Sequence, residues 1–410
     1  MPLNSVLITG AGPAGLTLAQ YLKTHHVPFR IIEKASESRL QGYSVTLHFG
    51  IPYITQAMGQ EKMDGFAEKT SVLYTDVTGF ATVTADGEIL IQTRGTPTIV
   101  GTGFRANRSR LRQFLLDGLD LETGVEVTGV EFPSDGVVIA KSNKGDIMAD
   151  IIVGADGLHS SIRQSIIGDK VEELTIMNLS GSTHITAEQY KAFAKYSPTH
   201  AMVHGTKLPG KEGVANIFFG INDFSKDNNT YHMRWVISWD RALIYNDIPN
   251  TNAGLHEFAQ EIASQFCEPF KSIVQETDPT SKIWLGKVCQ YMPDPSWNGN
   301  GKVTLIGDAL HSMTPYRGEG LNHAMIDIVQ LGEQLVKAHH DEITIAEAIA
   351  AYEAEAIPRG KRAVQASYES AYQLHEGFSW LVTRITKLFG LTLYYSGHLP
   401  FLRFFFPKTH

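Results

Sequence analysis

Two glycines and a strand-end aspartate in the last third of the chain are residue types that suit a redox cofactor. The apolar run 303–306 predicts a buried strand, which ends in Gly307 and Asp308. Gly318 and Gly320 then precede apolar residues at helical spacing, so a helix is predicted from about Gly320. A helix N-terminus presents unpaired N–H groups and a partial positive charge, and glycines let a ligand approach the main chain. This arrangement suits a ring that becomes anionic on reduction, with Asp308 accepting from ribityl-type hydroxyls. The stretch therefore outlines a flavin site.

A second glycine-rich segment, Gly10-Ala11-Gly12-Pro13-Ala14-Gly15, lies between a predicted strand at 6–9 and a predicted helix. A further strand follows at 29–32 and ends in Glu33. This is the βαβ pattern of dinucleotide-binding folds. Gly10 permits the tight turn, Gly12 lets the backbone approach a pyrophosphate, and Gly15 allows close packing of the helix on the strand. Glu33 is the expected acceptor for an adenosine ribose hydroxyl. The pattern alone does not separate FAD from NAD.

A third segment, 154–163, follows a predicted buried strand at 149–153 and carries Asp156 and Gly157 at a turn. Ser160 is placed to cap the helix that follows. Together the three segments resemble the class A flavoprotein monooxygenases, the 4-hydroxybenzoate hydroxylase family. The chain looks most like its compact members, which include tetracycline-inactivating and natural-product tailoring enzymes. The resemblance covers the FAD-binding part of the chain and very little of the part that would contact substrate.

The resemblance implies an FAD site built from these segments. Arg108, followed three residues later by Leu111, is similar to the family's arginine beside the ribityl chain and pyrophosphate, and a guanidinium suits a diphosphate. The expected cofactor-binding residues are Gly10, Gly12, Pro13, Ala14, Gly15, Glu33, Lys34, Arg108, Asp156, Gly157, Gly307, Asp308, Pro315, Gly318, Gly320, Leu321 and Asn322. Arg317 and Glu319 depart from the family's commonest sequence in the segment 307–322, which we call the third fingerprint. The carboxylate of Glu319 would either disfavour an anionic reduced ring or point to solvent.

The pattern of predicted elements indicates an α/β fold. The resemblance implies a Rossmann-like FAD-binding domain of the GR2 type, interleaved with a smaller β-sheet substrate domain and followed by C-terminal helices. The FAD-binding domain is expected at 1–70, 101–175 and 290–360, the β-rich domain at 71–100 and 176–289, and the C-terminal helical segment at 361–410. A hairpin is predicted within 71–92, with a turn at Asp86-Gly87. Helices are predicted to begin at about Arg105 and at Ile343; the latter should break or kink near Pro358, before a further helix at 361–376.

Period-two alternation along the predicted strand 231–239 separates an apolar face from a face that carries His232 and Arg234. In the family, the sheet of this domain covers the flavin and forms one wall of the substrate pocket. Either face is compatible with lining a pocket. No catalytic residue and no metal ligand is assigned.

The composition of the chain excludes some classes of partner and indicates its compartment. The chain has 410 residues, a formal net charge of -8 and no basic block, which argues against a nucleic-acid partner. Its two cysteines, Cys267 and Cys289, form no Cys-x-x-Cys motif, so two free thiols in a reducing cytosol are expected. No signal peptide and no run of 18 apolar residues is found, so a cytoplasmic protein is predicted. A monomer or a homodimer is expected.

The C-terminal stretch from Phe378 is aromatic and interrupted by basic residues. One interpretation is contact with a membrane surface, which would fit an apolar substrate. The favoured one is a C-terminal helix packed on the other domains, because large apolar side chains are more often buried than displayed.

The resemblance implies an FAD-dependent monooxygenase that consumes NAD(P)H and O2. Through a flavin C4a-hydroperoxide it would insert one oxygen atom, by hydroxylation or epoxidation, into an aromatic, enolic or olefinic small molecule, in secondary metabolism or aromatic degradation. The sequence has one GxGxxG motif, so NAD(P)H is expected to bind transiently as a co-substrate. One alternative is an FAD-dependent reductase or oxidase on the same fold acting on an apolar substrate. Another is a non-catalytic flavin-binding scaffold.

Overall fold

The computed structural model describes residues 3–36, 43–95, 104–133, 136–207, 211–245 and 247–377. Contacts divide the chain into two compact units. The first unit comprises Met1–Thr70, Arg108–Glu173 and Cys289–Glu369, and the second comprises Ser71–Asn107, Leu174–Val288 and the residues from Ser370 onward. The predicted C-terminal stretch from Phe378 lies outside the described residues, as does the part of the chain between Ser36 and Tyr43.

The first unit is built around a parallel sheet. Its elements are β1 (Val6–Thr9), α1 (Pro13–Thr24), β2 (Phe29–Glu33), β3 (Ser44–Leu47), α2 (Ile51–Met58), η1 (Glu61–Met63), α3 (Phe66–Thr70), α4 (Arg108–Leu116), β7 (Leu121–Thr123), β8 (Val127–Glu131), β9 (Val138–Ser142), β10 (Ile147–Ala149), β11 (Ile151–Gly154), α5 (Ser161–Ile167), β17 (Val303–Leu305), α9 (Asp308–His311), η2 (Pro315–Arg317) and α10 (Gly320–His339). Helix α11 (Ile345–Glu376) begins here.

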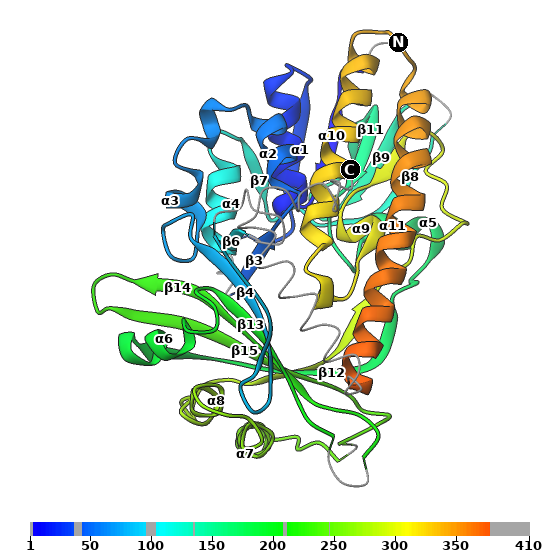
Figure 1. Ribbon diagram of the computed structural model, residues 1–410. Helices are drawn as coiled ribbons and strands as arrows, with labels where there is room; N and C mark the ends of the chain where they lie inside the picture. The colour runs from blue at the N-terminus through cyan, green and yellow to red at the C-terminus, as the bar shows by residue number, and fades with distance from the viewer. Residues whose placement is uncertain are drawn as a thin grey trace, which may run out of the picture. The chain divides into compact units, whose positions relative to one another are not determined.

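Five strands of this unit form the sheet in the order β17-β11-β1-β2-β7, and every neighbouring pair is parallel (Figure 1). All residues of β1 and β11 are buried, which agrees with their unbroken apolar sequences. Helices α1 and α10 pack closely, since a Cβ at Gly332 would lie 2.5 Å from the Tyr21 ring. A parallel sheet places the carboxyl ends of its strands along one edge, so the turns after β1, β2, β11 and β17 meet there.

The second unit contains a seven-stranded sheet in the order β16-β12-β15-β14-β13-β4-β5. Its elements are β4 (Thr78–Thr84), β5 (Ile89–Gly95), β6 (Phe104–Asn107), β12 (Glu172–Thr186), α6 (Ala187–Phe193), β13 (His200–His204), β14 (Asn216–Ser225), β15 (Thr230–Asp240), α7 (Asn252–Ala263), α8 (Phe270–Gln275) and β16 (Trp284–Gln290). Strands β4 and β5 form the predicted hairpin. Helices α7 and α8 cover one face of the sheet (Figure 1), where Trp235, Trp239 and Phe270 belong to a large apolar core.

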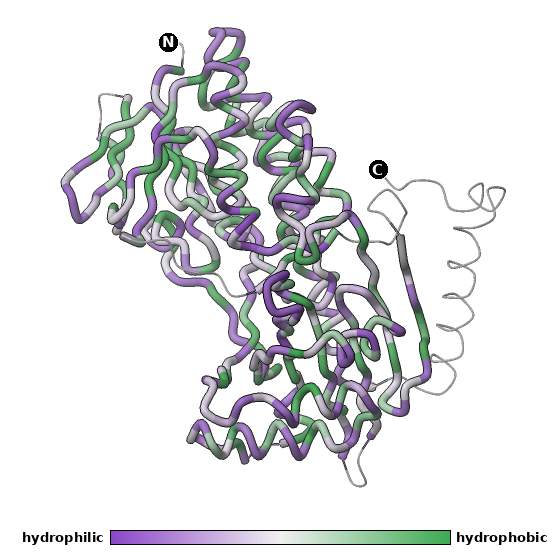
Figure 2. Tube along the Cα trace, turned by 90° about the vertical axis from the view of Figure 1, so that its left-hand side faces the viewer, coloured by the Kyte–Doolittle hydropathy of each residue, from purple (hydrophilic) through white to green (hydrophobic). Residues whose placement is uncertain are grey.

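Hydrophobic stretches alternate with hydrophilic ones along the chain, as the coloured trace shows (Figure 2). Buried hydrophobic residues occur on the strands of both sheets. The parallel sheet and the separate, mostly antiparallel sheet confirm the predicted α/β class. Cys267 and Cys289 are both free thiols. In the described part of the chain, no helix combines the length and apolarity needed to cross a membrane.

Two predicted element limits are wrong. Phe104–Asn107 is a strand, not the start of a helix, because the Val72 N–H donates to the Arg105 carbonyl at 3.0 Å and the Asn107 side chain donates to the Asn222 carbonyl at 2.9 Å. These bonds place 104–107 with the second unit, whereas the predicted domain limits, which remain a proposal, assign 101–107 to the FAD-binding domain. The predicted break at Pro358 is also absent, since α11 is continuous from Ile345 to Glu376.

A buried histidine makes the second unit sensitive to acid. His375, at the end of α11, is fully buried; its Nδ1 bonds the Ala371 carbonyl and its Nε2 bonds the Ser238 hydroxyl at 2.9 Å. Burial lowers its pKa to about 4. Because the unfolded-state pKa is about 6.5, its contribution to stability is present above that pH and is lost as the pH falls towards 4.

We therefore expect the free energy of unfolding to fall by about 2 kcal/mol or more between about pH 7 and pH 4.5 from His375 alone. Urea unfolding of the His375→Gln variant should show a flatter pH dependence, whatever its stability at neutral pH. His340→Gln, which replaces an exposed histidine, is the control and should leave the slope unchanged. Equal slopes for wild type and His375→Gln would contradict this assignment.

Candidate functional site

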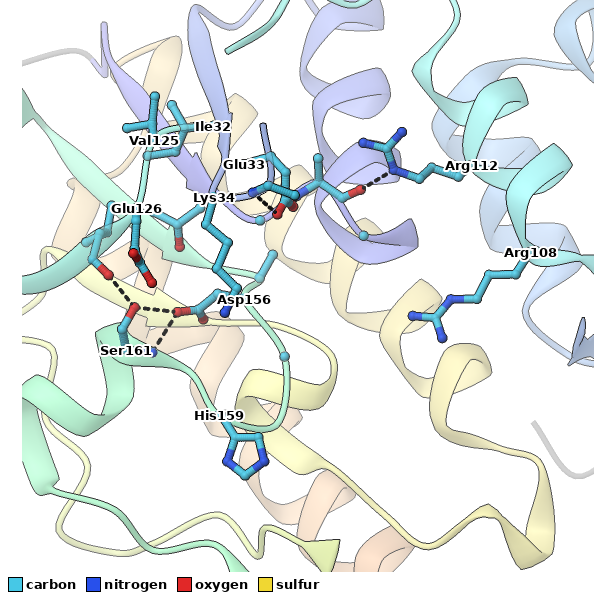
Figure 3. Close-up of a pocket in the computed structure, with 18 residues that line it drawn as sticks. Ile32, Glu33, Lys34, Arg108, Arg112, Val125, Glu126, Asp156, His159 and Ser161 are labelled. Atoms are coloured by element: carbon cyan, nitrogen blue, oxygen red, sulfur yellow. Dashed lines mark hydrogen bonds between the residues drawn. The ribbon is translucent and has the colours of Figure 1, made fainter. Parts of the chain in front are cut away.

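A cavity of about 360 Å³ opens in the first unit at the carboxyl ends of β1, β2 and β11 (Figure 3). Its walls are formed by Thr9, Gly10, Ala11, Gly12, Ile32, Glu33, Lys34, Ala35, Arg108, Arg112, Val125, Glu126, Val127, Ala155, Asp156, Gly157, His159 and Ser161. Of the predicted cofactor residues, the cavity brings together Gly10, Gly12, Glu33, Lys34, Arg108, Asp156 and Gly157. The glycine turn at 10–15, the segment 154–163 and the predicted Arg108 thus share one cavity.

The glycines of the first turn have three different physical roles. Gly10 has φ +104°, and a Cβ there would lie 2.5 Å from the Ala155 carbonyl oxygen, so the turn packs against the segment that carries Asp156. A Cβ at Gly15 would lie 2.0 Å from the Gly10 carbonyl oxygen, so this position needs glycine for close packing. A Cβ at Gly12 would meet no atom within 4 Å. Gly12 therefore leaves open space beside the main chain, as a ligand would require.

Helix α1 offers an anion-binding N-terminus at this position. Gly12 is its N-cap and makes no side-chain cap bond, and Pro13 begins the helix. The unpaired N–H groups of the first turn and the helix dipole favour a negative group here. Ala14 and Gly15 belong to the same first turn; neither they nor Pro13 line the cavity.

Glu33 holds the first turn in shape. One of its carboxylate oxygens accepts from the Ala11 N–H at 2.9 Å, and the other accepts from the Ala35 N–H at 3.0 Å. Both oxygens keep further acceptor capacity, so a bond to a ribose hydroxyl remains compatible with this geometry. Lys34 extends along the cavity wall next to Glu33 (Figure 3).

Two arginines of α4 reach the cavity from the opposite side (Figure 3). Arg112 donates from Nε to the Ala11 carbonyl at 3.1 Å, so it secures the glycine turn. Arg108 lies over the Tyr43 ring at 4.5 Å, and its buried Nε has no hydrogen-bond partner. Burial lowers the pKa of Arg108, while the charge of Asp308 acts to raise it. A half-buried guanidinium that lines the cavity suits an anionic group there.

Replacing Arg108 by methionine should separate binding from folding. The variant should bind FAD about ten- to a hundredfold more weakly, because a charge-assisted bond to the ligand is lost. Its thermal stability without FAD should be unchanged or higher, because an incompletely satisfied charge is removed. FAD titration followed by fluorescence and a melting curve of the apo-protein measure the two effects. Arg110→Met is the control on the same helix, because Arg110 lines a separate cavity. Equal FAD affinity of Arg108→Met and wild type would contradict the role.

Asp156 and Gly157 form the wall facing α4. The Ser161 N–H donates to Asp156 Oδ2 at 2.8 Å, while the buried Oδ1 has no hydrogen-bond partner. Gly157 has φ +84°, and a Cβ there would meet no atom within 4 Å. Ser160 caps α5 by accepting from the Arg163 N–H at 3.1 Å, so the predicted cap is confirmed. The open glycine borders space that a ligand can fill.

The third fingerprint lies beside this cavity but does not line it. A Cβ at Gly307 would lie 3.3 Å from the Ala14 Cβ, which places the end of β17 against the start of α1. The Asp308 side chain is accessible, yet desolvation by surrounding protein raises its pKa, against the lowering effects of His311 and then Arg108. A Cβ at Gly320 would lie 3.8 Å from Asp308 Oδ1. Asp308 is therefore positioned between the cavity arginine and the N-terminus of α10.

The remaining predicted residues lie in η2, in the turn after it and in the first turn of α10. Pro315 is exposed at the start of η2, Gly318 has φ +64°, and Leu321 is half-buried in the first turn of α10. Asn322 is fully buried and uses its whole side chain within the protein. Its Oδ1 accepts from the N–H groups of His48 and Gly50, and its Nδ2 donates to the carbonyls of Thr46 and Gly318. Direct cofactor contact by Asn322 stays a prediction; its bonds position the loops around the helix start.

The two residues that depart from the commonest third fingerprint form an ion pair with each other. Arg317 donates from Nε and Nη2 to the two carboxylate oxygens of Glu319, both at 2.9 Å. The bond to Glu319 is the main cause that raises the pKa of Arg317. The charge of Glu319 is thereby compensated locally, so it opposes the positive field of the α10 N-terminus less than an isolated carboxylate would.

Asp327 is the main feature of the site that the sequence reasoning missed. It is fully buried on α10, and its Oδ2 accepts from the Gly307 N–H and from His311 Nε2, both at 2.8 Å. Its Oδ1 accepts from Arg359 Nη2 at 2.8 Å. Asp327 thus fixes the strand end, α9 and α11 together. The sequence does contain a sign of this role. Asp327 lies between apolar residues on the buried side of a helix, where an acidic residue is rare unless it is paired.

Comparison with known proteins identifies the family. Residues 4–367 match the family model described as FAD binding domain. The chain belongs to this FAD-binding family. Two fungal relatives are named FAD-dependent monooxygenases: phnB of Penicillium herquei is 27% identical over 92% of each chain, and cctM of Talaromyces islandicus is 25% identical over 94% of this chain and 96% of its own. The predicted resemblance to class A flavoprotein monooxygenases is confirmed.

A solved structure shares the fold. HpxO of Klebsiella pneumoniae, in complex with FAD and uric acid, matches with a TM-score of 0.71 at 19% identity, over 95% of this chain and 92% of that chain. The chain is an FAD-dependent monooxygenase, and FAD is its cofactor. The cavity fits part of that cofactor: the α1 N-terminus and Arg108 suit its pyrophosphate, and the open space at Gly12 and Gly157 lets the cofactor approach the main chain.

Proposed function

We propose that this FAD-dependent monooxygenase uses NAD(P)H and O2 to insert one oxygen atom, by hydroxylation or epoxidation, into an aromatic, enolic or olefinic small molecule. The observation that carries the proposal is the shared cavity of Gly12, Arg108 and Asp156 in a member of the FAD-binding family. The uric acid bound to HpxO is consistent with a planar, electron-rich substrate. A cytoplasmic location and a monomer or homodimer stay proposals.

The chain's own residues would hold the cofactor and tune its surroundings. The bound FAD would take electrons from NAD(P)H and activate O2. Arg108 and the α1 N-terminus would bind the pyrophosphate, with Gly10, Gly15 and Glu33 keeping the turn in shape. The α10 N-terminus would favour negative charge, while the Arg317–Glu319 ion pair limits the opposing charge nearby. NAD(P)H would bind transiently, since the sequence has a single GxGxxG motif.

Incorporation of labelled oxygen tests this function. Purified protein loaded with FAD is incubated with NADPH, oxygen-18-labelled O2 and a panel of phenolic and enolic ring compounds. We expect a substrate that stimulates NADPH oxidation and a product that carries one labelled oxygen atom. A product formed without the label would contradict oxygenation and would favour the alternative, an FAD-dependent reductase or oxidase acting on an apolar substrate.

A further inference from the structure

Two charged side chains meet at the start of α10, where the sequence departs from the family's commonest form. Arg317 ends η2, and Glu319 is the N-cap residue of α10. Gly318 between them has φ +64°, a conformation that favours glycine, and the two side chains meet across this turn. Arg317 donates from Nε and Nη2 to both carboxylate oxygens of Glu319 at 2.9 Å. The planar guanidinium thereby holds both oxygens in one orientation.

The carboxylate of Glu319 does not cap its own helix. The first turn of α10 contains no acidic residue and receives no hydrogen bond from the side chain of its N-cap residue. A helix start carries N–H groups without an intrahelical partner and a partial positive charge, which together attract a free carboxylate. The bidentate bond to Arg317 instead engages both oxygens of Glu319. The first turn of α10 is therefore left open to an anionic group from elsewhere.

Arg317 is the cation that compensates Glu319 at neutral pH. Among the described residues, the basic side chains that contact Glu319 are Arg317 and, at 4.0 Å, His323. Burial, and then the charges of His311 and Arg359, lower the pKa of His323 to about 4, so this imidazole is neutral at pH 7. Arg359 Nη1 lies 3.4 Å from His323 Nδ1 and can only donate, so the hydrogen of His323 is on Nε2. His323 thus adds no compensating charge beside Glu319.

The first turn of α10 is connected to the cavity that fits the pyrophosphate of FAD. Arg108 lines that cavity, and its charge is among the causes that act to lower the pKa of Asp308. Asp308 Oδ1 in turn lies 3.8 Å from the position of a Cβ at Gly320. These contacts lead from the cavity through Asp308 to the start of α10, where the proposed function places the negative charge of the reduced ring.

We propose that Arg317 is a positioning residue, which holds the Glu319 carboxylate off the N-terminus of α10 and so keeps the first turn open to the negative charge of the reduced cofactor. The inference rests on the proposed function, in which this helix start favours negative charge. Without Arg317, the carboxylate competes for the same N–H groups and its charge opposes reduction. Neither side chain forms or breaks a covalent bond.

The midpoint potential of the FAD-loaded protein tests this role, measured by reductive titration against a reference dye without NAD(P)H, O2 or substrate. In Arg317→Met the ratio of reduced to oxidised FAD at a fixed potential should fall about tenfold, which for a two-electron couple is a shift of about 30 mV to lower potential. In a Glu319→Gln background the same change should alter the ratio less than about threefold, because no carboxylate is released. Arg317→Lys should have a smaller effect than Arg317→Met, because the charge is kept and only the planar fork is lost.

Arg30→Met is the matched control. Arg30 donates from Nε and Nη2 to the two carboxylate oxygens of Glu122 at 2.9 and 3.0 Å, so it forms the same kind of ion pair, outside the cavity lining. Its replacement should leave the potential unchanged. FAD content and melting temperature are measured for every variant, so that only folded and loaded protein is compared. An unchanged potential in Arg317→Met, an equal shift in the Glu319→Gln background, or the same shift in Arg30→Met would overturn the role.

The wild-type preparation is also assayed for incorporation of labelled oxygen, which separates the two proposals. The expected shifts in potential without any oxygen incorporation would overturn the proposed oxygenation and leave the role of Arg317 standing. Oxygen incorporation together with an unchanged potential in Arg317→Met would overturn the role of Arg317 alone.

Discussion

Replacing Gly12 by glutamate is expected to lower the affinity for FAD at least about a hundredfold, while the protein stays folded. A Cβ at Gly12 meets no atom within 4 Å, and its φ of -75° suits any residue, so the fold accepts a side chain there. That side chain must extend into the cavity, where its carboxylate would occupy and repel the position of the pyrophosphate. A negative charge at a helix N-terminus is itself mildly stabilising. FAD titration and the melting curve of the apo-protein measure both effects.

Gly286→Glu is the matched control for this variant. A Cβ at Gly286, on β16, also meets no atom within 4 Å, so the same charge is added at a glycine that is equally open and outside the cavity. It should bind FAD like wild type. Retention of FAD by Gly12→Glu would show that the cofactor does not approach the first turn of α1.

The second large effect is expected on stability, from Asp327→Asn. This carboxylate is fully buried and accepts from His311, Arg359 and the Gly307 N–H. Although burial alone would lower the pKa of His311, the Asp327 carboxylate raises it, and the two side chains stabilise each other. Breaking a buried pair from one side leaves its partner uncompensated, which typically costs about 3–5 kcal/mol. Urea unfolding at neutral pH should show a loss of that size.

Glu355→Gln provides the comparison, because Glu355 is the other acid bonded to Arg359 and its side chain is 43% exposed. Exposed ion pairs contribute about 1 kcal/mol or less, so this variant should unfold almost like wild type. A loss below about 1 kcal/mol for Asp327→Asn would mean that the buried network does not stabilise the first unit.

The cofactor segments could be predicted from the sequence because each depends on local backbone geometry. Gly10 and Gly157 have positive φ values that favour glycine, and both follow buried strands whose apolar sequences are easily recognised. The carboxyl ends of parallel strands meet at one edge, so three distant segments were expected to converge. Gly12 and Asp156 line one cavity, while Gly307 packs against Ala14 next to it.

Strand β12 was not predicted, although it is the longest in the sheet. Its apolar alternation is interrupted at Gly181, where a Cβ would lie 2.4 Å from the Trp235 ring. The Trp235 ring on the neighbouring strand fills the space that a side chain at position 181 would occupy. This contact depends on the pairing of the two strands, so it cannot be recognised in the sequence of β12 alone. Ser180 and Ser182 on the other face leave little hydrophobic signal.

Helix α11 shows tertiary contacts overriding a local rule. Proline disfavours a helix interior because it lacks an N–H and its ring clashes with the preceding turn. On either side of Pro358, however, the Tyr352 hydroxyl donates to the Leu305 carbonyl at 2.9 Å and Arg359 pairs with Asp327. A Cβ at Gly360 would lie 2.9 Å from His311, so the helix is also packed tightly there. These long-range contacts are invisible in a local pattern.

The central claim is that the cavity of Gly12, Arg108 and Asp156 binds the adenosine diphosphate half of FAD. Equilibrium dialysis of apo-protein with FAD, in the presence of ADP or riboflavin, tests it most directly. We expect one FAD per chain, displacement by ADP at lower concentration than by riboflavin, and loss of both FAD and ADP binding in Gly12→Glu. FAD binding that ADP does not affect, or that Gly12→Glu retains, would contradict it.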